Sequence, residues 1–71
     1  MYLVIEIQTS GGKISTLNYQ FNALNLAEQK YYSILSAAAV SSIDVHAAMI
    51  VDNRGVVLKN DFYDHTALGG D

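Results

Sequence analysis

The sequence contains no cysteine, only two histidines and only four basic residues. The lack of cysteine excludes disulfides and thiolate metal sites. Two histidines are too few for a structural zinc site unless carboxylates contribute, so we predict no metal and no cofactor. The four basic residues stand against seven acidic ones, which gives a net charge of −3. A general nucleic-acid-binding domain carries a basic stripe, and we therefore expect no binding to duplex DNA or RNA.

Long hydrophobic runs are missing as well. No apolar stretch approaches the roughly 20 residues that span a bilayer. The first residues, MYLVIEIQ, lack the positive start and the apolar run of about 7–15 residues that mark a secretory signal. We therefore expect a cytoplasmic protein without a membrane partner.

The chain is short, with 71 residues, and 51% of them are hydrophobic. This length allows one domain at most. At about this size a folded chain buries only about 60% of the surface that its unfolded form exposes. Small domains therefore often depend on disulfides, a metal or a partner subunit. Since the first two are excluded, we predict that the protein is a homo-oligomer, a dimer or larger.

Alternation of apolar and polar residues predicts four strands. Residues 2–8 and 13–21 alternate on either side of Gly11-Gly12, and paired glycines suit a tight hairpin turn. Residues 44–51 and 56–63 alternate on either side of the turn sequence Asp52-Asn53-Arg54-Gly55. The pattern predicts two β-hairpins, with Val57 on the same face of the last strand as Lys59.

The segment between the hairpins has the pattern of a helix. Asn25 and Glu28 have the spacing of a capping box, and no Gly or Pro occurs from residue 26 to about residue 41. Within it, Ala37-Ala38-Ala39 would let another element approach closely, either the chain's own sheet or the helix of a second copy. One apolar stripe with three- and four-residue steps runs along this helix: Ala27, Tyr31, Ile34, Leu35 and Ala38.

These elements predict an α+β fold of the order ββαββ. We expect a four-stranded, mainly antiparallel sheet with one helix packed on one face, a single domain over residues 1–63 and a flexible C-terminal tail over residues 64–71. One helix covers one face only, so the other face or a strand edge is the expected dimer surface. We assign Val4, Ile50 and either Val57 or its neighbours, depending on strand order, to that uncovered face.

The two histidines are candidates for a ligand site. His46 follows Asp44 by two residues, and a carboxylate–imidazole pair could orient a general base. The alternative is a partly buried histidine hydrogen-bonded to the backbone. His65 follows Tyr63 just past the last strand, where it could fold back to line a pocket or remain an exposed residue of the tail.

Aromatic and basic residues supply the other candidates. Tyr31 and Tyr32 lie about 100° apart on the helix, so one can enter the core while the other faces solvent or a partner, or the pair can form a platform for a stacked base. Arg54 and Lys59 could converge on an anion such as a nucleotide phosphate in an oligomer, or belong to a solvated turn. We predict no catalytic residue, and the candidate ligand-binding residues are Tyr31, Tyr32, His46, Arg54, Lys59, Tyr63 and His65.

Several segments together resemble one family, and they are residues 5–9, 27–31, 34–41, 45–48 and 63–65. The chain is similar to short uncharacterised proteins encoded by phages, prophages and mobile elements of Gram-positive bacteria, and the resemblance covers nearly its whole length. Position 32 is Tyr where such proteins have His, which argues against a histidine-based site on the helix.

The resemblance implies a role for a phage protein without catalytic motifs. It favours a non-enzymatic, self-associating binding protein of the host cell cytosol that counters host defence, by sequestering a nucleotide-type signal between subunits or by blocking a host protein. The alternative is a structural or assembly accessory protein of the phage particle. A small enzyme that uses His46 is a third hypothesis.

Overall fold

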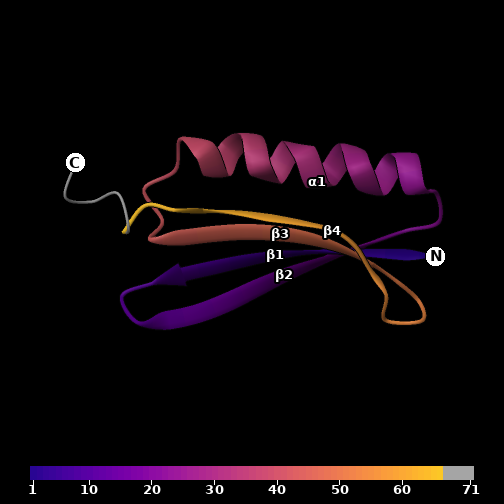
Figure 1. The fold of residues 1–71 in the computed structure, drawn as a ribbon, viewed down its shortest axis with the longest axis horizontal. Helices are drawn as coiled ribbons and strands as arrows, with labels where there is room; N and C mark the ends of the chain where they lie inside the picture. Colours follow the sequence, from indigo (N-terminus) through magenta and orange to yellow (C-terminus); the bar gives the residue numbers. More distant parts are fainter. Residues whose placement is uncertain (67–71) are drawn as a thin grey trace.

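The structure, a computed structural model, describes residues 1–66 and confirms the predicted α+β arrangement. Four antiparallel strands form one open sheet in the order β2-β1-β3-β4, and the single helix lies across one of its faces (Figure 1). The elements in chain order are β1 (Tyr2–Ser10), β2 (Lys13–Phe21), α1 (Leu24–Ala39), β3 (Val45–Asp52) and β4 (Val57–Asp64).

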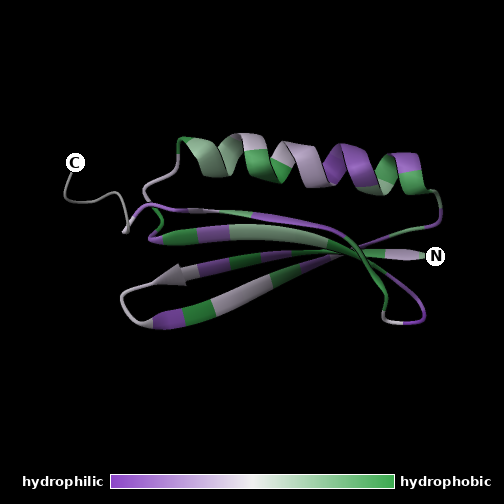
Figure 2. Ribbon diagram, viewed as in Figure 1, coloured by the Kyte–Doolittle hydropathy of each residue, from purple (hydrophilic) through white to green (hydrophobic). Residues whose placement is uncertain are grey.

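Cross-strand pairing determines which side chains share a face of the sheet. Val4 of β1 stands opposite both Tyr19 of β2 and Ile50 of β3. Directly opposed residues point to the same face. Figure 2 shows hydrophobic and hydrophilic residues as colour bands along β1 and β2. Val4 and Ile50 are fully buried beneath α1. The assignment of these two residues to the uncovered face was therefore wrong.

The core lies between α1 and the two central strands. The predicted stripe of the helix is confirmed, because Ala27, Tyr31, Ile34, Leu35 and Ala38 are its buried residues. These side chains pack on Val4, Ala48 and Ile50, and Tyr2, Tyr19 and Phe21 close the sides of the cluster.

The alanine run lies at the C-terminal end of α1. Ala38 is fully buried, whereas Ala37 and Ala39 are exposed. The small side chain of Ala38 therefore lets the helix approach its own sheet closely, which is the first of the two roles that the sequence left open for this run.

The ends of α1 differ from the prediction. The first turn closes with a bond from the Ala27 N–H to the Ala23 carbonyl, and Ala23 occupies the N-cap without a side-chain hydrogen bond. The capping box at Asn25 was therefore wrong, because Asn25 already lies inside the first turn. At the other end the N–H groups of Val40 and Ser41 bond to Ala37 and Ala38, so the helix ends at Ala39.

A β-bulge changes the faces of β4. Ile50 pairs with Lys59 but the next residue, Val51, pairs with Val57, which leaves Leu58 as the extra residue. Regular alternation predicted that Val57 shares a face with Lys59. The bulge instead places Val57 opposite Val51, on the face away from the helix.

The chain past β4 is held by hydrogen bonds as far as it is described. Asp64 still belongs to β4, one residue beyond the predicted domain boundary. Its Oδ1 atom accepts bonds from the backbone N–H of Thr66, at 3.0 Å, and from the Thr66 hydroxyl, at 2.6 Å. The remaining residues of the predicted tail, 67–71, lie outside the described residues. Within the described part, α1 is neither long nor apolar enough to cross a membrane.

Candidate functional site

The face of the sheet away from α1, called the open face below, carries a continuous apolar surface. Its centre comes from the residues of β1 and β3 that alternate with the residues buried under α1. Its borders come from the edge strands β2 and β4. The apolar residues of the open face are Leu3, Ile5, Ile7, Ile14, Val45, Ala47, Met49, Val51, Val57 and Phe62.

On the two central strands, the open face holds more large apolar side chains than the face under the helix. Beneath α1 the central strands contribute Val4, Ala48 and Ile50 to the core, and the other described positions of that face include Glu6 and His46. On the open face Phe62 is 61% exposed and Ile14 is 71% exposed. Contiguous apolar patches of this kind mark interaction surfaces, so the open face is the leading candidate for binding.

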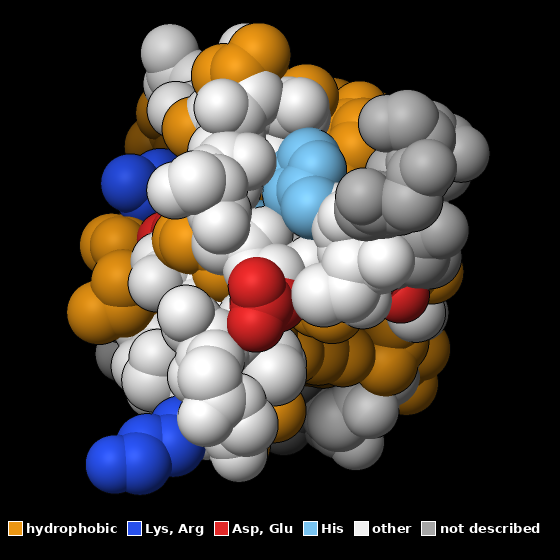
Figure 3. Space-filling view, turned by 90° about the vertical axis from the view of Figure 1, so that its left-hand side faces the viewer, with side chains coloured by type: hydrophobic (Ala, Val, Ile, Leu, Met, Phe, Trp, Pro, Cys, Tyr) orange, Lys and Arg blue, Asp and Glu red, His pale blue; other side chains and the backbone are white. Residues whose placement is uncertain are grey.

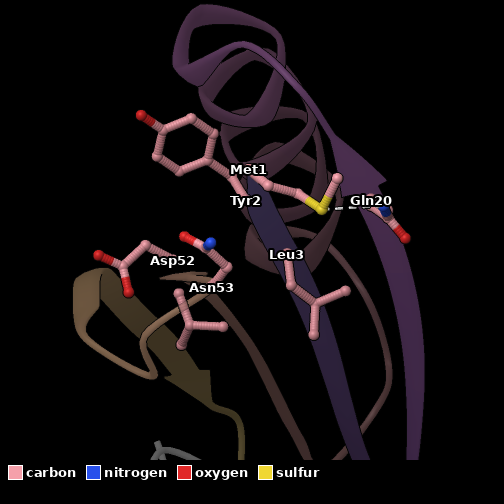
Figure 4. A pocket seen from close by; sticks show the side chains of 7 residues that line it. Met1, Tyr2, Leu3, Gln20, Asp52 and Asn53 are labelled. Carbon is pink, nitrogen blue, oxygen red and sulfur yellow. Dashed lines mark hydrogen bonds between the residues drawn. The ribbon is translucent and has the colours of Figure 1, made fainter.

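Two depressions lie along the open face. One is lined by Ile7, Val45, Met49 and Phe62 among others. The second lies at the opposite end of the sheet, where the side chains come from the start of β1, the end of β2 and the end of β3 (Figure 4). There the Gln20 amide nitrogen lies 3.2 Å from the Met1 sulfur. The residues that line this second pocket are Met1, Tyr2, Leu3, Gln20, Val51, Asp52 and Asn53.

On the covered face, His46 is bound by two side chains that the sequence did not connect with it. Its Nε2 atom lies 2.6 Å from Glu6 Oε2, and its Nδ1 atom lies 3.2 Å from the Ser41 hydroxyl. A carboxylate only accepts hydrogen bonds, so the Nε2–H donates to Glu6. In the neutral ring the Nδ1 atom then accepts the proton of Ser41. The expected partner, Asp44, instead accepts a bond from the Gly11 backbone N–H at 3.2 Å.

The Glu6 carboxylate is stabilised in its charged form. Burial by itself would raise its pKa. Hydrogen bonds from His46 and Gln8 and the electrostatic influence of His46 and Lys30 outweigh burial and hold the pKa of Glu6 below its ordinary value. The Gln8 amide lies 2.9 Å from the same Oε2 atom. Glu6 is therefore fixed as an acceptor that joins β1 to the first part of β3.

Serine, histidine and a carboxylate in a row invite comparison with hydrolytic triads. Here His46 is only 4% exposed, and both of its ring nitrogens are already bonded. The Ser41 hydroxyl also accepts the backbone N–H of Ile43, at 3.4 Å. The arrangement thus ties the loop after α1 to the sheet, and within residues 1–66 every buried side-chain nitrogen or oxygen atom has a partner.

The two adjacent tyrosines diverge as the helix geometry predicted. Tyr31 is buried and Tyr32 is 53% exposed, with their rings in an edge-to-face contact at 5.0 Å. Burial, followed by the charge of Asp61, raises the pKa of Tyr31. The Lys59 ammonium lies 5.7 Å from the centre of the Tyr32 ring. Of these two rings, only that of Tyr32 is accessible to a ligand.

The two basic candidates have different partners. Arg54 forms a bidentate pair with Asp52, with Nε at 3.1 Å and the terminal nitrogen at 2.8 Å from the same carboxylate oxygen. The hydrogen bonds from the Arg54 guanidinium hold the pKa of Asp52 below its ordinary value, and the Asp52 carboxylate also accepts the backbone N–H of Val56 at 3.0 Å. Lys59 instead lies 3.8 Å from Glu28 of the helix. The structure thus gives each cation its own carboxylate.

His65 folds back, but onto the end of the helix. Its Nε2 atom lies 2.9 Å from the Ala38 carbonyl, and its backbone N–H bonds to the Asp44 carbonyl at 2.8 Å. The ring stacks on Tyr63 with a centroid separation of 6.3 Å. A histidine that donates to a terminal carbonyl caps the helix. Figure 3 looks onto this end of the molecule, where histidine and acidic side chains reach the surface.

The seven residues chosen from the sequence therefore form no single site in one chain. The structure brings Tyr31, Tyr32 and Lys59 together. It also places Tyr63 beside both His46, its partner across the strands, and His65, whereas Arg54 lies apart with Asp52. The sequence reasoning missed Glu6 and Ser41 as partners of His46. The polar position of Glu6 within an apolar strand was the available signal.

Comparisons with known proteins do not extend these observations. No protein family, curated protein or solved structure matches the chain. Among residues 1–66, moreover, no cluster of three or more histidine or acidic side chains is placed to hold a metal ion.

Proposed function

We propose that this protein is a non-enzymatic binding protein and that it self-associates face to face through its open face. The observation that carries the proposal is the distribution of apolar side chains: Ile5, Ile7 and Met49 occupy the centre of a face that no element of residues 1–66 covers. A second copy that packs on this face would turn the single sheet into a two-sheet sandwich with a helix on each outer side.

The size of the open face fits a homodimer. Four strands at a spacing of about 4.8 Å span roughly 19 Å, and eight residues at about 3.4 Å each span roughly 27 Å. The flat area is therefore about 500 Å² per copy, or about 1,000 Å² for two copies. That is near the lower bound for a specific interface, and protruding side chains increase it.

Charge also favours a second copy as the occupant. The apolar residues of the open face are bordered along β2 by Thr16, Asn18 and Gln20, which are uncharged. A face without charge at its centre can meet its own copy there without repulsion, although the chain carries a net charge of −3. The acidic Asp64 lies at one corner of the open face, at the rim of the proposed interface.

For the cellular role we propose that the oligomer is a phage protein that counters host defence by blocking a host protein. The resemblance to short phage proteins supports the origin. The contacts of Arg54 with Asp52 and of Lys59 with Glu28 favour a protein target over a nucleotide-type signal, because a phosphate would have to compete with a carboxylate for each cation.

Substitution at the centre of the open face tests the contact. We expect Ile5→Lys to raise the dissociation constant of the oligomer at least tenfold, because the interface would bury two added charges. The matched control is Leu26→Lys, which adds the same charge to an exposed apolar position of α1. Sedimentation equilibrium measures both constants. Equal effects of the two variants, or none from Ile5→Lys, would contradict the proposed face.

A further inference from the structure

The two edges of the sheet differ in how well they are protected. The β4 edge carries the bulge at Leu58 and the charged residues Lys59 and Asp61, all of which are devices that prevent strand addition. The β2 edge is less protected. It is a regular strand of nine residues without proline or bulge, and its only charged residue is Lys13 at its start.

The β2 strand is also uncovered. Figure 1 shows β2 as the strand farthest from α1, and six of its nine residues in a row, 13–18, are exposed. Leu17 at its centre is 49% exposed although it is a large apolar residue. An exposed and regular edge strand is a template for pairing with another strand.

The hairpin turn determines which backbone groups of β2 face outward. Gly11 and Gly12 both have positive φ, at 59° and 79°, as in the two-residue turn whose flanking residues are hydrogen-bonded. Ser10 and Lys13 are therefore a hydrogen-bonded pair, and bonded and non-bonded pairs alternate along the ladder. The N–H and C=O groups that point to the free edge are consequently those of Ile14, Thr16, Asn18 and Gln20.

These outward groups are symmetric about Leu17. Residues 14 and 20, and residues 16 and 18, lie at equal distances from it, and the strand itself extends four residues to each side. A two-fold axis at Leu17 would therefore align all nine residues of β2 with the nine residues of an antiparallel β2 from a second copy. In that register Ile14 bonds to Gln20 of the second copy and Thr16 bonds to Asn18 of the second copy, so every outward backbone group is satisfied.

The side chains agree with this register. Leu17 would pack against Leu17 of the second copy, and Ser15 would face Tyr19, which leaves room for the aromatic ring. Lys13 would lie beside Phe21 of the second copy, so no two like charges oppose each other along the strand. We propose that β2 pairs with β2 of a second copy about a two-fold axis at Leu17, forming one continuous eight-stranded sheet.

This edge contact does not depend on the face-to-face contact, and the two can coexist. The edge contact leaves the open faces of both copies uncovered. Two perpendicular two-fold axes, one through the edge and one through the open face, would give a tetramer with closed symmetry. Failure of one contact reduces the tetramer to a dimer of the other kind, so the two proposals fail in distinguishable ways.

A single added cysteine tests the axis, because the chain has no cysteine of its own. In the proposed register residue 17 faces itself in a non-hydrogen-bonded pair, with Cα atoms about 4.5 Å apart, which a disulfide can bridge. We expect more than half of a Leu17→Cys variant to become a covalent dimer under mild oxidation. Ser15→Cys is the matched control on the same strand and face, since the two copies of residue 15 lie about 14 Å apart.

The outcomes separate clearly. Selective cross-linking of Leu17→Cys, with little from Ser15→Cys, supports the axis at Leu17. Equal cross-linking of both variants, or none from Leu17→Cys, overturns it. If Leu17→Cys does not cross-link but the protein remains oligomeric in solution, the face-to-face contact is still supported. Cross-linking of Leu17→Cys only to another polypeptide would likewise overturn the second copy as the occupant.

A charge-swap experiment provides an independent test. Leu17→Lys and Leu17→Glu each place like charges opposite each other on the axis, so each variant alone should lose the edge contact. To remove the face-to-face dimer, both variants also carry Ile5→Lys. An equimolar mixture should then restore the edge contact as a heterodimer in native mass spectra, with at least a tenfold preference over either homodimer. A mixture that shows no such preference contradicts a two-fold axis at this residue.

Discussion

The Nε2 atom of His46 lies 2.6 Å from Glu6 Oε2, and this pair joins the two central strands of the sheet across 40 residues of sequence. Both side chains lie on the face that α1 covers, and Ser41 extends the contact to the loop after the helix. The pair is therefore a polar contact between β1 and β3 on the covered face, whereas the open face is apolar.

The lowered pKa of Glu6 predicts how stability depends on pH. A carboxyl group with a lowered pKa in the folded state stabilises the fold above its ordinary value, 4.5, and this contribution disappears as the pH falls through the folded value. We expect Glu6→Gln to be less stable than the natural chain at pH 7. The difference should shrink on acidification to about pH 3, as measured by urea unfolding at a fixed protein concentration.

Glu28→Gln is the control for this series. It also removes one carboxylate, but from a partly exposed ion pair with Lys59 at 3.8 Å, which contributes little to stability. Its stability should follow that of the natural chain across the same pH range. If the stability of Glu6→Gln kept the full pH dependence of the natural chain, the Glu6–His46 pair would not be a source of acid sensitivity.

The two faces of the sheet should respond differently to loss of an isoleucine. Ile50 is fully buried under α1, so Ile50→Ala should cost about 2–5 kcal/mol of the free energy of unfolding at any protein concentration. Ile5 lies on the open face, and the cost of Ile5→Ala should grow with protein concentration because it weakens association. Urea unfolding at two concentrations a hundredfold apart measures this, and a cost of Ile5→Ala that is the same at both contradicts the interface.

The helix cap at His65 is a third test. Its Nε2 atom is 2.9 Å from the Ala38 carbonyl, so His65→Ala should reduce the free energy of unfolding by about 1 kcal/mol. His65→Gln, which keeps an N–H donor on a side chain of similar reach, should recover part of the loss. Thermal unfolding distinguishes the variants, and equal losses from both would mean that the bond to Ala38 contributes nothing.

Nucleotide capture gives a fourth test, which compares the two defence mechanisms. Because Arg54 and Lys59 each lie beside a carboxylate, we expect no thermal shift with cyclic or ADP-ribose-type nucleotides. A ligand present at 100 times its dissociation constant would add about 2.7 kcal/mol to the free energy of unfolding, which is readily seen in a small domain. A shift of that size would favour signal sequestration over the blocking of a host protein.

The order of elements was predictable because each depends on local pattern. Alternation revealed the strands, Gly11-Gly12 marked the first turn, and three- and four-residue steps from Ala27 to Ala38 identified the buried stripe of the helix. Both turns and all five elements followed from residues that are close in sequence.

What the sequence did not reveal depends on contacts between distant segments. Alternation groups Val4 with Glu6 but does not say which face of the sheet the helix will cover. The bulge at Leu58 has no glycine or proline to mark it. His46 was paired with Asp44, its near neighbour, while its partner in the fold is Glu6 on another strand. The helix likewise begins at Leu24, with Ala23 at the N-cap, and not at the predicted cap Asn25.

The most direct test of the central claim is native mass spectrometry of the unmodified chain at micromolar concentration. A protein that hides its open face against a second copy should appear as a dimer, or as a tetramer if the β2 edges also pair, with little monomer. A spectrum that contains only monomer at that concentration would contradict self-association through the open face.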